Sequence, residues 1–484
     1  MKILFATPEC APYVKTGGLG DVSAALPATL ARLGHDVRVL LPAYTGMRVA
    51  GEAADAIELP AHGPFPAARL QPVRTPHGVT LLLLACPALY QRNGGPYVNA
   101  QGHDHHDNAL RFGYLSRVAA ALGTAASPCP GWRADVVHAN DWPCGLAPLY
   151  LAQARPGEAT AASVMTIHNI AFQGLFPMDV ADLLGVAHRW RGIDGVEYWG
   201  NLSMLKAGLQ FADAITTVSP TYAREIRTEA FGVGLHGVLQ SRAERLSGIL
   251  NGIDTQVWNP ATDALIPQRF DARQPAGKAL DKAALQRRCG LAVDPQAMLF
   301  GVVSRLTAQK GIDLVLDSLE PLLAQGGQLA VLGQGEPALH DALQAAARAK
   351  PGRVAATFGY DEALAHLIEA GADCFLMPSR FEPCGLNQMY SQAYGTLPIV
   401  SPTGGLLDSV VDASADPAQG TGFVMRSVDA PGLQEALARA MQAWRTPAQW
   451  RRIQANAMAR DFGWERSAAR YLEVYERALR ERRP

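Results

Sequence analysis

The segment "KILFATPECAPYVKTGGLGDVSAALPATLARLGHDVRVLLP" (residues 2–42) predicts a strand, a glycine-rich loop, a helix and a second strand. The loop holds Lys15 together with Gly17, Gly18 and Gly20. Glycine loses much conformational freedom on folding, so three glycines in one loop suggest that a ligand approaches bare peptide N–H groups. The ligand expected there is an anion. A sharp turn from strand to helix that binds nothing fits the same residues equally well.

The same alternation of strands and helices continues along the chain and predicts an α/β fold. Strands that alternate with helices form parallel sheets, and such sheets bind ligands at the carboxyl ends of their strands. In the first half we expect strands within residues 2–7, 36–42, 79–85, 135–139, 163–169, 213–219 and 246–252. In the second half we expect them within residues 297–306, 328–337, 353–360, 373–386, 396–410 and 420–425.

The length of 484 residues exceeds the roughly 250 to 300 at which one hydrophobic core stops growing. Residues 259–282 are rich in Pro, Ala and Asp without clear periodicity, and they indicate a linker between two doubly wound lobes. We therefore expect an N-terminal lobe over residues 1–255 and a C-terminal lobe over residues 256–460. A last helix over residues 461–484, with its aromatic residues on one side, is expected to cross back to the first lobe.

Composition excludes several classes of partner. Lys and Arg number 43 against 44 Asp and Glu, and a net charge of −1 offers no footprint for nucleic acid or an anionic membrane. No apolar run approaches the roughly 18 residues of a membrane span, and the apolar start is too short for a signal peptide. The seven cysteines include no C-x-x-C pair, which favours reduced thiols and a cytoplasmic location. The expected partner is a small molecule or a neutral polymer.

Polar residues and glycines follow most of the expected strands, where a parallel sheet places its ligands. If the two lobes face each other, these edges form a cleft. The candidates in the first lobe are Lys15, Asn140, Asp141, His168, Asn169 and Asn251. Those in the second are Arg305, Lys310, Gly333, Gly335, Tyr360, Glu382, Cys384, Gly385, Thr403, Gly404 and Gly405.

Each cluster also has a plainer interpretation. Arg305 and Lys310 could be surface cations, but cations beside a helix start repel its dipole unless an anion lies between them, which favours phosphate binding. "GQG" (residues 333–335) is weak evidence for dinucleotide binding because the third glycine is missing. A lone His168 at a strand end is more often a core residue than a catalytic one. "GHDHHD" (residues 102–107) suggests a hydrated loop rather than a metal site.

Taken together, the motifs resemble the bacterial glycogen synthases and plant starch synthases. The matching blocks, in family order, are "KTGGLGDV", "VVHANDW", "TIHNIAFQG", "VSPTYAREI", "GILNGID", "VVSRLTAQKGIDLVL", "PSRFEPCGLNQMY" and "YGTLPIVSPTGGLLDSV". The resemblance implies a GT-B fold of two facing Rossmann-like lobes with a cleft between them. It also implies a retaining transfer of glucose from ADP-glucose to the non-reducing end of an α-1,4-glucan, which elongates glycogen.

The same resemblance implies roles for individual residues. Arg305 and Lys310 would hold the donor diphosphate, and Tyr360 would stack near the adenine. The residues implied to contact the donor's glucose or phosphates are Lys15, Gly17, Gly18, Asp21, Asp141, His168, Asn251, Glu382, Cys384, Gly385, Leu386, Thr403 and Gly404. No cofactor or metal is expected, because two basic side chains take the role of a divalent ion.

The chemistry agrees with this inventory. Cleavage of the anomeric C–O bond leaves negative charge on the diphosphate and positive charge on the sugar, so cations are needed on one side and polar or acidic groups on the other. Loss of Arg305 or Lys310 should therefore damage turnover more than folding. With no pair of carboxylates at glycosidase-like spacing, a front-face route is favoured over double displacement, and Glu382 would stabilise the donor rather than attack it.

The sequence departs from the family pattern at two positions, and several alternative functions stay open. Tyr390 stands where many related retaining enzymes have a second glutamate, and Asn140 where bacterial relatives commonly have histidine. UDP-glucose could be the preferred donor. From other classes, a nucleotide-sugar epimerase would need acid/base carboxylates in place of an acceptor groove. An inactive glucan-binding protein would have no need to keep Lys15, Arg305 and Lys310 together.

Overall fold

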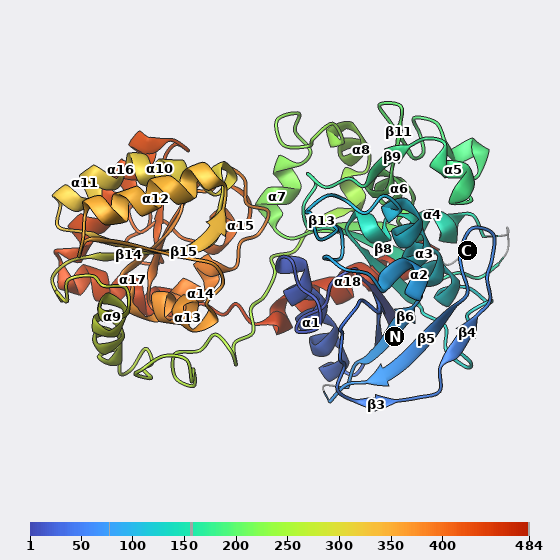
Figure 1. Ribbon diagram of the computed structural model, residues 1–484, viewed down its shortest axis with the longest axis horizontal. Coiled ribbons are helices and arrows are strands. Elements are labelled where there is room, and N and C mark those ends of the chain that lie inside the picture. The colour runs from blue at the N-terminus through green and yellow to red at the C-terminus, as the bar shows by residue number, and fades with distance from the viewer. Residues whose placement is uncertain (77, 155–157, 483–484) are drawn as a thin grey trace. The chain divides into compact units, whose positions relative to one another are not determined.

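The computed structural model describes residues 1–76, 78–154 and 158–482 and divides the chain into two compact units. Unit 1 comprises Met1–Gly252 and the segment that begins at Trp464, and unit 2 comprises Ile253–Gly463 (Figure 1). The chain thus leaves unit 1 after Gly252 rather than at residue 255. It re-enters unit 1 at Trp464 rather than 461. Residues 483 and 484 of the expected last helix lie outside the described residues.

Unit 1 is built on a ten-stranded sheet of order β13-β12-β8-β7-β1-β2-β6-β5-β3, with β4 paired to β5. The seven strands from β13 to β6 in this order are parallel, and all seven strands expected in the first half are confirmed. They are β1 (Lys2–Ala6), β2 (Asp36–Pro42), β6 (Thr80–Ala85), β7 (Val136–Asn140), β8 (Ala162–Ile167), β12 (Ala214–Thr217) and β13 (Leu246–Gly248). The carboxyl ends of β1, β7, β8 and β13 therefore lie along one edge.

An antiparallel edge and a second small sheet complete the strands of unit 1, and the sequence patterns did not predict either. The antiparallel strands are β5 (Ala68–Arg74), which pairs with β6, and β3 (Glu52–Ala53) and β4 (Ile57–Leu59), which pair with β5 at the edge. The small sheet has the order β10-β11-β9, with β9 (Leu175–Pro177), β10 (Glu197–Tyr198) and β11 (Asn201–Ser203). These strands are short or half-exposed, so they lack the apolar runs that mark the buried strands.

Helices join the parallel strands of unit 1 in the manner of βαβ units. The first begins at Gly18, directly after the glycine-rich loop, and buries Leu19, Val22, Leu26 and Leu30 against the sheet. The helices are α1 (Gly18–Arg32), α2 (Pro87–Tyr90), α3 (Asn108–Leu122), α4 (Leu146–Ala152), α5 (Val180–Leu183), α6 (Met204–Phe211), α7 (Pro220–Glu225), α8 (His236–Ser241) and α18 (Trp464–Arg482). Short 3-10 turns are η1 (Trp142–Cys144), η2 (His188–Trp190) and η3 (Ala243–Arg245).

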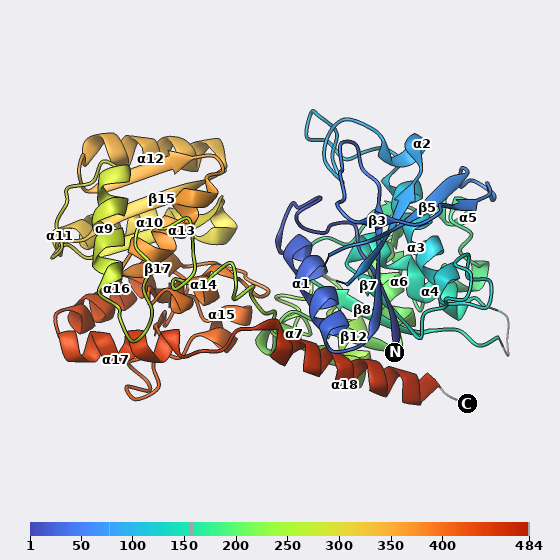
Figure 2. The same ribbon diagram turned by 90° about the horizontal axis from the view of Figure 1, so that it is seen from below.

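The terminal helix α18 packs beside α1 within unit 1 (Figure 2). Its buried side includes Trp464, Tyr471 and Tyr475, which join one hydrophobic cluster with residues of β1 and β8. The Tyr475 hydroxyl also lies 2.8 Å from Nδ1 of His138, whose Nε2 contacts Thr166 Oγ1 at 2.5 Å. A fully buried polar chain of this kind fixes the helix to the sheet.

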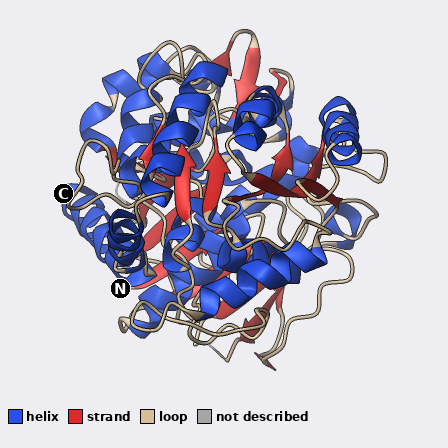
Figure 3. Cartoon of the chain, turned by 90° about the vertical axis from the view of Figure 1, so that its left-hand side faces the viewer, coloured by secondary structure: helices blue, strands red, loops and turns tan. Residues whose placement is uncertain are grey.

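Unit 2 is a six-stranded parallel sheet of order β16-β15-β14-β17-β18-β19. Alternate residues of its strands enter two different hydrophobic clusters: Phe300 and Val302 one, Leu299 the other. Both faces of the sheet are therefore covered by helices (Figure 3). The strands, all expected, are β14 (Leu299–Leu306), β15 (Gln328–Gly335), β16 (Val354–Phe358), β17 (Cys374–Met377), β18 (Leu397–Val400) and β19 (Phe423–Val424).

The helices of unit 2 follow its strands in turn. They are α9 (Gly277–Arg288), α10 (Ile312–Asp317), α11 (Leu319–Ala324), α12 (Pro337–Ala349), α13 (Glu362–Gly371), α14 (Asn387–Ala393), α15 (Gly404–Ser409), α16 (Ala430–Trp444) and α17 (Pro447–Met458), with the 3-10 turn η4 (Ala308–Lys310). None of the helices among the described residues is long and apolar enough to cross a membrane.

The segment expected to be a linker is packed into unit 2. Asp263 is buried, and its carboxylate lies 2.7 Å from Nδ1 of His366 and accepts a hydrogen bond of 2.5 Å from the Tyr394 hydroxyl. Trp258 stacks on His366 and on Tyr390, with ring centroids 3.9 Å apart in each pair. Lack of periodicity in this segment therefore reflects irregular but anchored backbone rather than a loose connection, and α9 already begins at Gly277.

Candidate active site

A buried glutamate organises the glycine-rich loop of unit 1. Glu9 Oε2 accepts hydrogen bonds from the N–H groups of Thr16 (2.5 Å) and Gly17 (3.2 Å). Its Oε1 accepts from the Thr16 hydroxyl and the Tyr97 hydroxyl, both at 2.6 Å. The Gly17 N–H, expected to meet a donor phosphate, is thus occupied by a carboxylate of the chain itself. An incoming anion is left with the first turn of α1, which begins at Gly18.

The sequence prediction missed Glu9. Its only signal was its position, three residues after the end of β1 and at the edge where a parallel sheet places ligands. A single acidic residue in that position carries no spacing pattern, so no motif identified it.

Lys15 lies over the first turn of α1 and remains half-exposed. Its ammonium group lies 2.8 Å from Oδ1 of Asp21, and the two side chains are 50% and 31% exposed. Gly20 makes this position possible, because a Cβ there would lie 3.1 Å from Cγ of Lys15. Burial raises the pKa of Asp21, and the Lys15 ammonium works against that shift. Lys15 and Asp21 are therefore in contact, but Asp21 lies in the first turn of α1 rather than in the same loop as Lys15.

Asp141 lies directly after β7 in a backbone conformation that L-residues rarely adopt, with φ of 52°. This turn aims its carboxylate at β8, where Oδ1 accepts the N–H groups of His168 (2.7 Å) and Asn169 (3.4 Å). Burial nevertheless raises the pKa of Asp141 to about 7, and the nearby Glu9 carboxylate adds to the rise. The charged form of Asp141 is thus costly in the absence of a positive partner.

His168 is held neutral and in one tautomer. Its Nε2 lies 2.9 Å from Oδ1 of Asn140, whose amide NH2 group donates to the Ala6 carbonyl at 3.0 Å. Because that amide donates through its nitrogen, its oxygen accepts, and Nε2 of His168 carries the proton. Burial lowers the pKa of His168 to about 3. His168 can therefore orient a polar ligand but adds no positive charge at neutral pH.

Asn251 contributes an unused acceptor at the end of β13. Its side chain is buried, and among the described residues its Oδ1 has no hydrogen-bond partner. A buried unpaired oxygen costs about 1–3 kcal/mol, which a ligand hydroxyl or N–H would recover. The edge of unit 1 therefore presents the carboxylates of Glu9, Asp21 and Asp141 together with a vacant amide oxygen.

In unit 2 the two predicted cations differ in their surroundings. Arg305, at the end of β14, is exposed and forms no ion pair with any described residue. Lys310, in η4, lies 2.5 Å from Oε2 of Glu382, and the two side chains are 18% and 8% exposed. The Ser379 hydroxyl donates to the same oxygen at 3.1 Å. Lys310 and Glu382 therefore form one buried pair, and Arg305 is the cation free to meet a ligand charge.

The loops that carry these cations are tied to each other. Gln309 Nε2 donates to the Phe381 carbonyl at 3.0 Å, and the Arg380 N–H donates to the Gln309 carbonyl at 2.8 Å. The Arg380 guanidinium also forms two hydrogen bonds, of 2.8 and 2.6 Å, with the carboxylate of Asp313. The ends of β14 and β17 thus form one rigid support for the Lys310–Glu382 pair.

Glycines let the loop after β18 lie against the Glu382 loop. A Cβ on Gly404, whose φ is +44°, would lie 1.9 Å from the Glu382 carbonyl oxygen, and one on Gly405 would lie 2.3 Å from that of Cys384. Gly385 has φ of +70°, which also favours glycine. Thr403 and Leu386 stand directly before α15 and α14. The predicted residues after β17 and β18 are therefore brought together by backbone contact.

Two other predicted positions lie apart from these contacts. Tyr360, after β16, has a ring that is 88% exposed and so could be covered by a flat ligand. In the "GHDHHD" loop, His105 Nε2 contacts the Gly95 carbonyl at 3.1 Å. Within the parts of the chain that the structure describes, no three His, Cys, Asp or Glu side chains are grouped to hold a metal ion.

Two Rossmann-like units with charged residues and glycines at their strand ends are typical of GT-B glycosyltransferases. Models of two glycosyltransferase families match the chain in agreement with this. Residues 2–241 match the starch synthase catalytic domain, and residues 290–457 match the glycosyl transferases group 1. The protein is therefore a glycosyltransferase with two Rossmann-like α/β domains.

Similar curated proteins show which family of glycosyltransferases the chain belongs to. A glycogen synthase of Paracidovorax citrulli is 61% identical over 98% of this chain and 94% of its own length. One of Dechloromonas aromatica is 52% identical over 99% of both chains. The chain belongs to the glycogen synthase family.

Solved structures agree with the fold. The catalytic domain of starch synthase IV from Arabidopsis thaliana, solved with ADP and acarbose, is 33% identical with a TM-score of 0.88, and the match covers 99% of both chains. A sucrose-phosphate synthase from Thermosynechococcus elongatus, 18% identical with a TM-score of 0.61 over 99% of both chains, shares the fold alone.

Proposed function

We propose that this chain transfers glucose from ADP-glucose to the non-reducing end of an α-1,4-glucan and retains the anomeric configuration, which elongates glycogen. The observation that carries the proposal is the exposed Arg305 guanidinium, which forms no ion pair with a described residue and belongs to β14, the strand that precedes the turn η4 with Lys310. An exposed arginine held on a rigid strand end is suited to grip a diphosphate bidentately. The names of the relatives and the ADP in the starch synthase structure support the donor.

In this proposal unit 2 holds the leaving group. Arg305 and Lys310 meet the negative charge that grows on the diphosphate as the anomeric C–O bond breaks. Tyr360 offers an exposed ring for the adenine. The backbone of Cys384, Gly385, Leu386, Thr403 and Gly404 borders the donor at the ends of β17 and β18.

Unit 1 is proposed to hold the glucose. The vacant Oδ1 of Asn251 accepts a sugar hydroxyl, and His168 and Asp141 supply further polar contacts. Positive charge that develops on the sugar is stabilised by the carboxylates of Glu9 and Asp141. The same positive charge lowers the cost of ionising Asp141. The buried Asp141 carboxylate therefore stabilises the transition state, which carries that charge, more than it stabilises the site without a substrate.

A front-face route fits these contacts. In it the bond from the sugar C1 to the phosphate oxygen breaks, the acceptor hydroxyl forms its bond to C1 on the same face, and the leaving phosphate takes the hydroxyl proton. Glu382 is bound to Lys310 and Ser379, which supports a role in stabilising the donor rather than attacking it. Asp141 already accepts two backbone N–H groups, which reduces its nucleophilicity.

We also propose that the enzyme works in the cytoplasm. All seven cysteines lie within the described ranges, and none forms a disulfide. Reduced thiols are the rule in that compartment. ADP-glucose is proposed as the donor and glycogen or another α-1,4-glucan as the acceptor.

The test is incorporation of radiolabelled glucose into glycogen by the purified chain, from ADP-glucose and from UDP-glucose, with a chelator present. We expect label from ADP-glucose in α-1,4 linkages. Preferential use of UDP-glucose would replace the donor assignment but keep the reaction. Label from neither donor would contradict the proposal and favour an inactive glucan-binding protein.

A further inference from the structure

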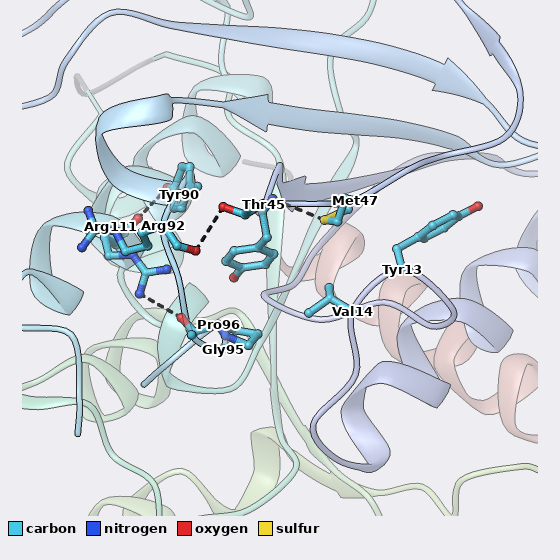
Figure 4. A pocket seen from close by; sticks show the side chains of 11 residues that line it. Tyr13, Val14, Thr45, Met47, Tyr90, Arg92, Gly95, Pro96 and Arg111 are labelled. Atoms are coloured by element: carbon cyan, nitrogen blue, oxygen red, sulfur yellow. Dashed lines mark hydrogen bonds between the residues drawn. The ribbon is translucent and has the colours of Figure 1, made fainter. Parts of the chain in front are cut away.

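Unit 1 contains a cavity of about 100 Å³ that the residues of the candidate active site do not account for. It lies among the loop after β2, the end of α2, the segment before α3 and the loop after β1 (Figure 4). Its lining includes Tyr13, Tyr44, Tyr90, Arg92 and Arg111. Three tyrosines and two arginines around so small a space indicate a polar ligand rather than an apolar one.

Arg111 is the deepest charged group of this cavity, and its side chain is fully buried. Its Nε donates to the Leu89 carbonyl at 2.8 Å, and its Nη1 donates to the Pro96 carbonyl at 2.8 Å and to Asn108 Oδ1 at 2.6 Å. Nη2 has no hydrogen-bond partner among the described residues. Every acceptor found for Arg111 is neutral, so a buried positive charge and two N–H groups are left without a counterpart.

The other charges around the cavity do not compensate Arg111. Arg92 forms two hydrogen bonds, of 2.7 and 2.9 Å, with the two carboxylate oxygens of Asp107, and this pair is neutral. Burial lowers the pKa of Arg111, but an arginine stays protonated in proteins. Among the residues that line the cavity, two guanidinium groups thus share one carboxylate. The nearest further carboxylate that acts on the lining is Glu9, which is near enough to raise the pKa of Tyr44 but is itself bound by Thr16, Gly17 and Tyr97.

A second unused donor belongs to a residue of the same lining. The Tyr44 hydroxyl is buried and has no hydrogen-bond partner within the described ranges. The Tyr90 hydroxyl, in contrast, donates to the Arg111 carbonyl at 2.7 Å and is occupied. Two buried donors in one lining, each costing about 1–3 kcal/mol when unpaired, favour a ligand that accepts hydrogen bonds.

We propose that this cavity binds a small oxyanion of the phosphate class, with Nη2 of Arg111 and the Tyr44 hydroxyl as its donors. A cavity of about 100 Å³ has the volume of roughly three liquid waters, at about 30 Å³ each, and suits a phosphoryl group. Pockets that enclose whole drug-sized ligands are larger, about 300 Å³ or more, so the cavity suits the phosphoryl end of a ligand rather than a whole nucleotide. The oxyanion is either free phosphate or the phosphoryl end of a larger molecule.

The site has a structural link to the glycine-rich loop. Tyr13 and Val14 line the cavity, and Lys15 follows them directly. A bound oxyanion braces the segment just before Lys15. The proposal does not rest on the glycosyltransferase reaction, because binding to this cavity can be measured without turnover.

The experiment is calorimetric titration of the full chain with inorganic phosphate, and separately with glucose 1-phosphate, at constant ionic strength. An Arg305→Ala variant removes the main phosphate contact proposed in unit 2. We expect saturable binding of phosphate that persists in Arg305→Ala and weakens about tenfold in Tyr44→Phe, as the loss of one hydrogen bond to an anion predicts. Tyr150→Phe is the matched control, because its buried hydroxyl donates to the Leu184 carbonyl instead.

The outcomes separate the possibilities. Binding of glucose 1-phosphate but not of phosphate, with the same dependence on Tyr44, identifies the phosphoryl end of a larger molecule and supports the proposal. Affinity that falls in Arg305→Ala but is unchanged in Tyr44→Phe overturns it, and so does the absence of saturable binding. A response to maltose in place of phosphate also overturns it and makes the cavity a sugar subsite.

Discussion

Asp141 combines two unfavourable features in one residue, a left-handed backbone and a buried carboxylate. Its φ of 52° and ψ of −178° lie in a region that glycine populates almost alone, and such a conformation costs about 1–3 kcal/mol. The conformation persists because Oδ1 accepts the N–H groups of His168 and Asn169. Such local strain is common at functional sites, where the geometry matters more than the stability.

Asp141→Asn should stabilise the fold at neutral and alkaline pH. Burial raises the pKa of Asp141 from 3.8 to about 7, so the folded chain holds this proton more tightly than the unfolded chain does. The Asp141 contribution to stability is therefore lost as the pH rises from about 4 to about 7. The neutral amide avoids that loss, and we expect a gain of a few kcal/mol near pH 8 with turnover strongly reduced. Melting temperature against pH checks this, and an equal gain near pH 4 would contradict it.

We predict that Arg305 and Lys310 differ in their effect on stability, whereas the sequence alone leads us to expect that loss of either affects turnover more than folding. Arg305→Ala removes an exposed side chain, so the free energy of unfolding should change by less than about 0.5 kcal/mol. Turnover should fall by about two to three orders of magnitude. Lys310→Ala leaves the Glu382 carboxylate buried with Ser379 alone, and breaking a buried pair costs up to about 3–5 kcal/mol.

The double variant Lys310→Ala/Glu382→Gln separates the two effects of Lys310. The neutral glutamine no longer needs a cation, so most of the lost stability should return while turnover stays low. Urea unfolding and the glucose-incorporation assay on the same preparations provide the measurements. If the double variant is as unstable as Lys310→Ala, the Lys310–Glu382 ion pair is not the source of the loss.

At the scale of elements, the loop after β18 is supported on the loop after β17 through glycines. Gly404→Ala should therefore destabilise unit 2 by several kcal/mol and reduce turnover, since its Cβ would lie 1.9 Å from the Glu382 carbonyl oxygen. Gly290→Ala is the matched control. Gly290 also has positive φ (+69°), but a Cβ there meets no atom within 4 Å, so only the cost of about 1–2 kcal/mol for backbone strain applies. Equal losses of stability in the two variants would show that the contact with Glu382 is unimportant.

Elements with a clear pattern were predictable from the sequence, and the others were not. All thirteen expected strands form, because buried parallel strands give continuous apolar runs. The antiparallel strand β5 escaped prediction because its buried residues are interrupted by Arg69, Gln71 and Arg74. The last helix begins at Trp464, where its buried aromatic residues begin. Gly463, which stands directly before it and separates it from α17, is a sequence signal for this boundary that the expected start at residue 461 overlooks.

The sequence predicted which residues belong to the candidate site, but not which of them contact one another. Motif order placed Asp141, His168 and Glu382 at strand ends, and their contacts depend on tertiary geometry that spacing does not contain. The link from Glu9 to Tyr97 spans 88 residues, and that from Lys310 to Glu382 spans 72. Long-range hydrogen bonds of this kind leave no local pattern in the chain.

For the whole molecule, acid should weaken unit 1 more than unit 2. Burial lowers the pKa of His138 and His168 from 6.5 to about 3, so their contribution to stability is lost as the pH falls from about 6.5 towards 3. The raised pKa of Asp141 has the opposite effect, because acid favours its folded, protonated form, and this offsets part of the lost stability. In unit 2, burial raises the pKa of Asp281 to about 6 and also that of Glu369, so acid favours their folded, neutral forms.

Hydrogen exchange followed by mass spectrometry tests this prediction unit by unit. Between about pH 7 and pH 5, and after correction for the intrinsic exchange rate, protection of β7 and β8 should fall relative to that of β14 and β15. A relative loss of protection in β14 and β15 would contradict the assignment of acid sensitivity to the two buried histidines.

The return of α18 to unit 1 has a consequence for biosynthesis. A ribosome delivers the chain from its amino end, so Trp464, Tyr471 and Tyr475 emerge only after all of Ile253–Gly463 has been made. Until α18 has been synthesised, part of the apolar interior of unit 1 stays uncovered. Unit 2 is continuous in sequence, so all of its residues have been synthesised before α18. The domain that is translated first is thus completed only after the second, and a chain cut short before Trp464 contains a whole second domain attached to an unfinished first one.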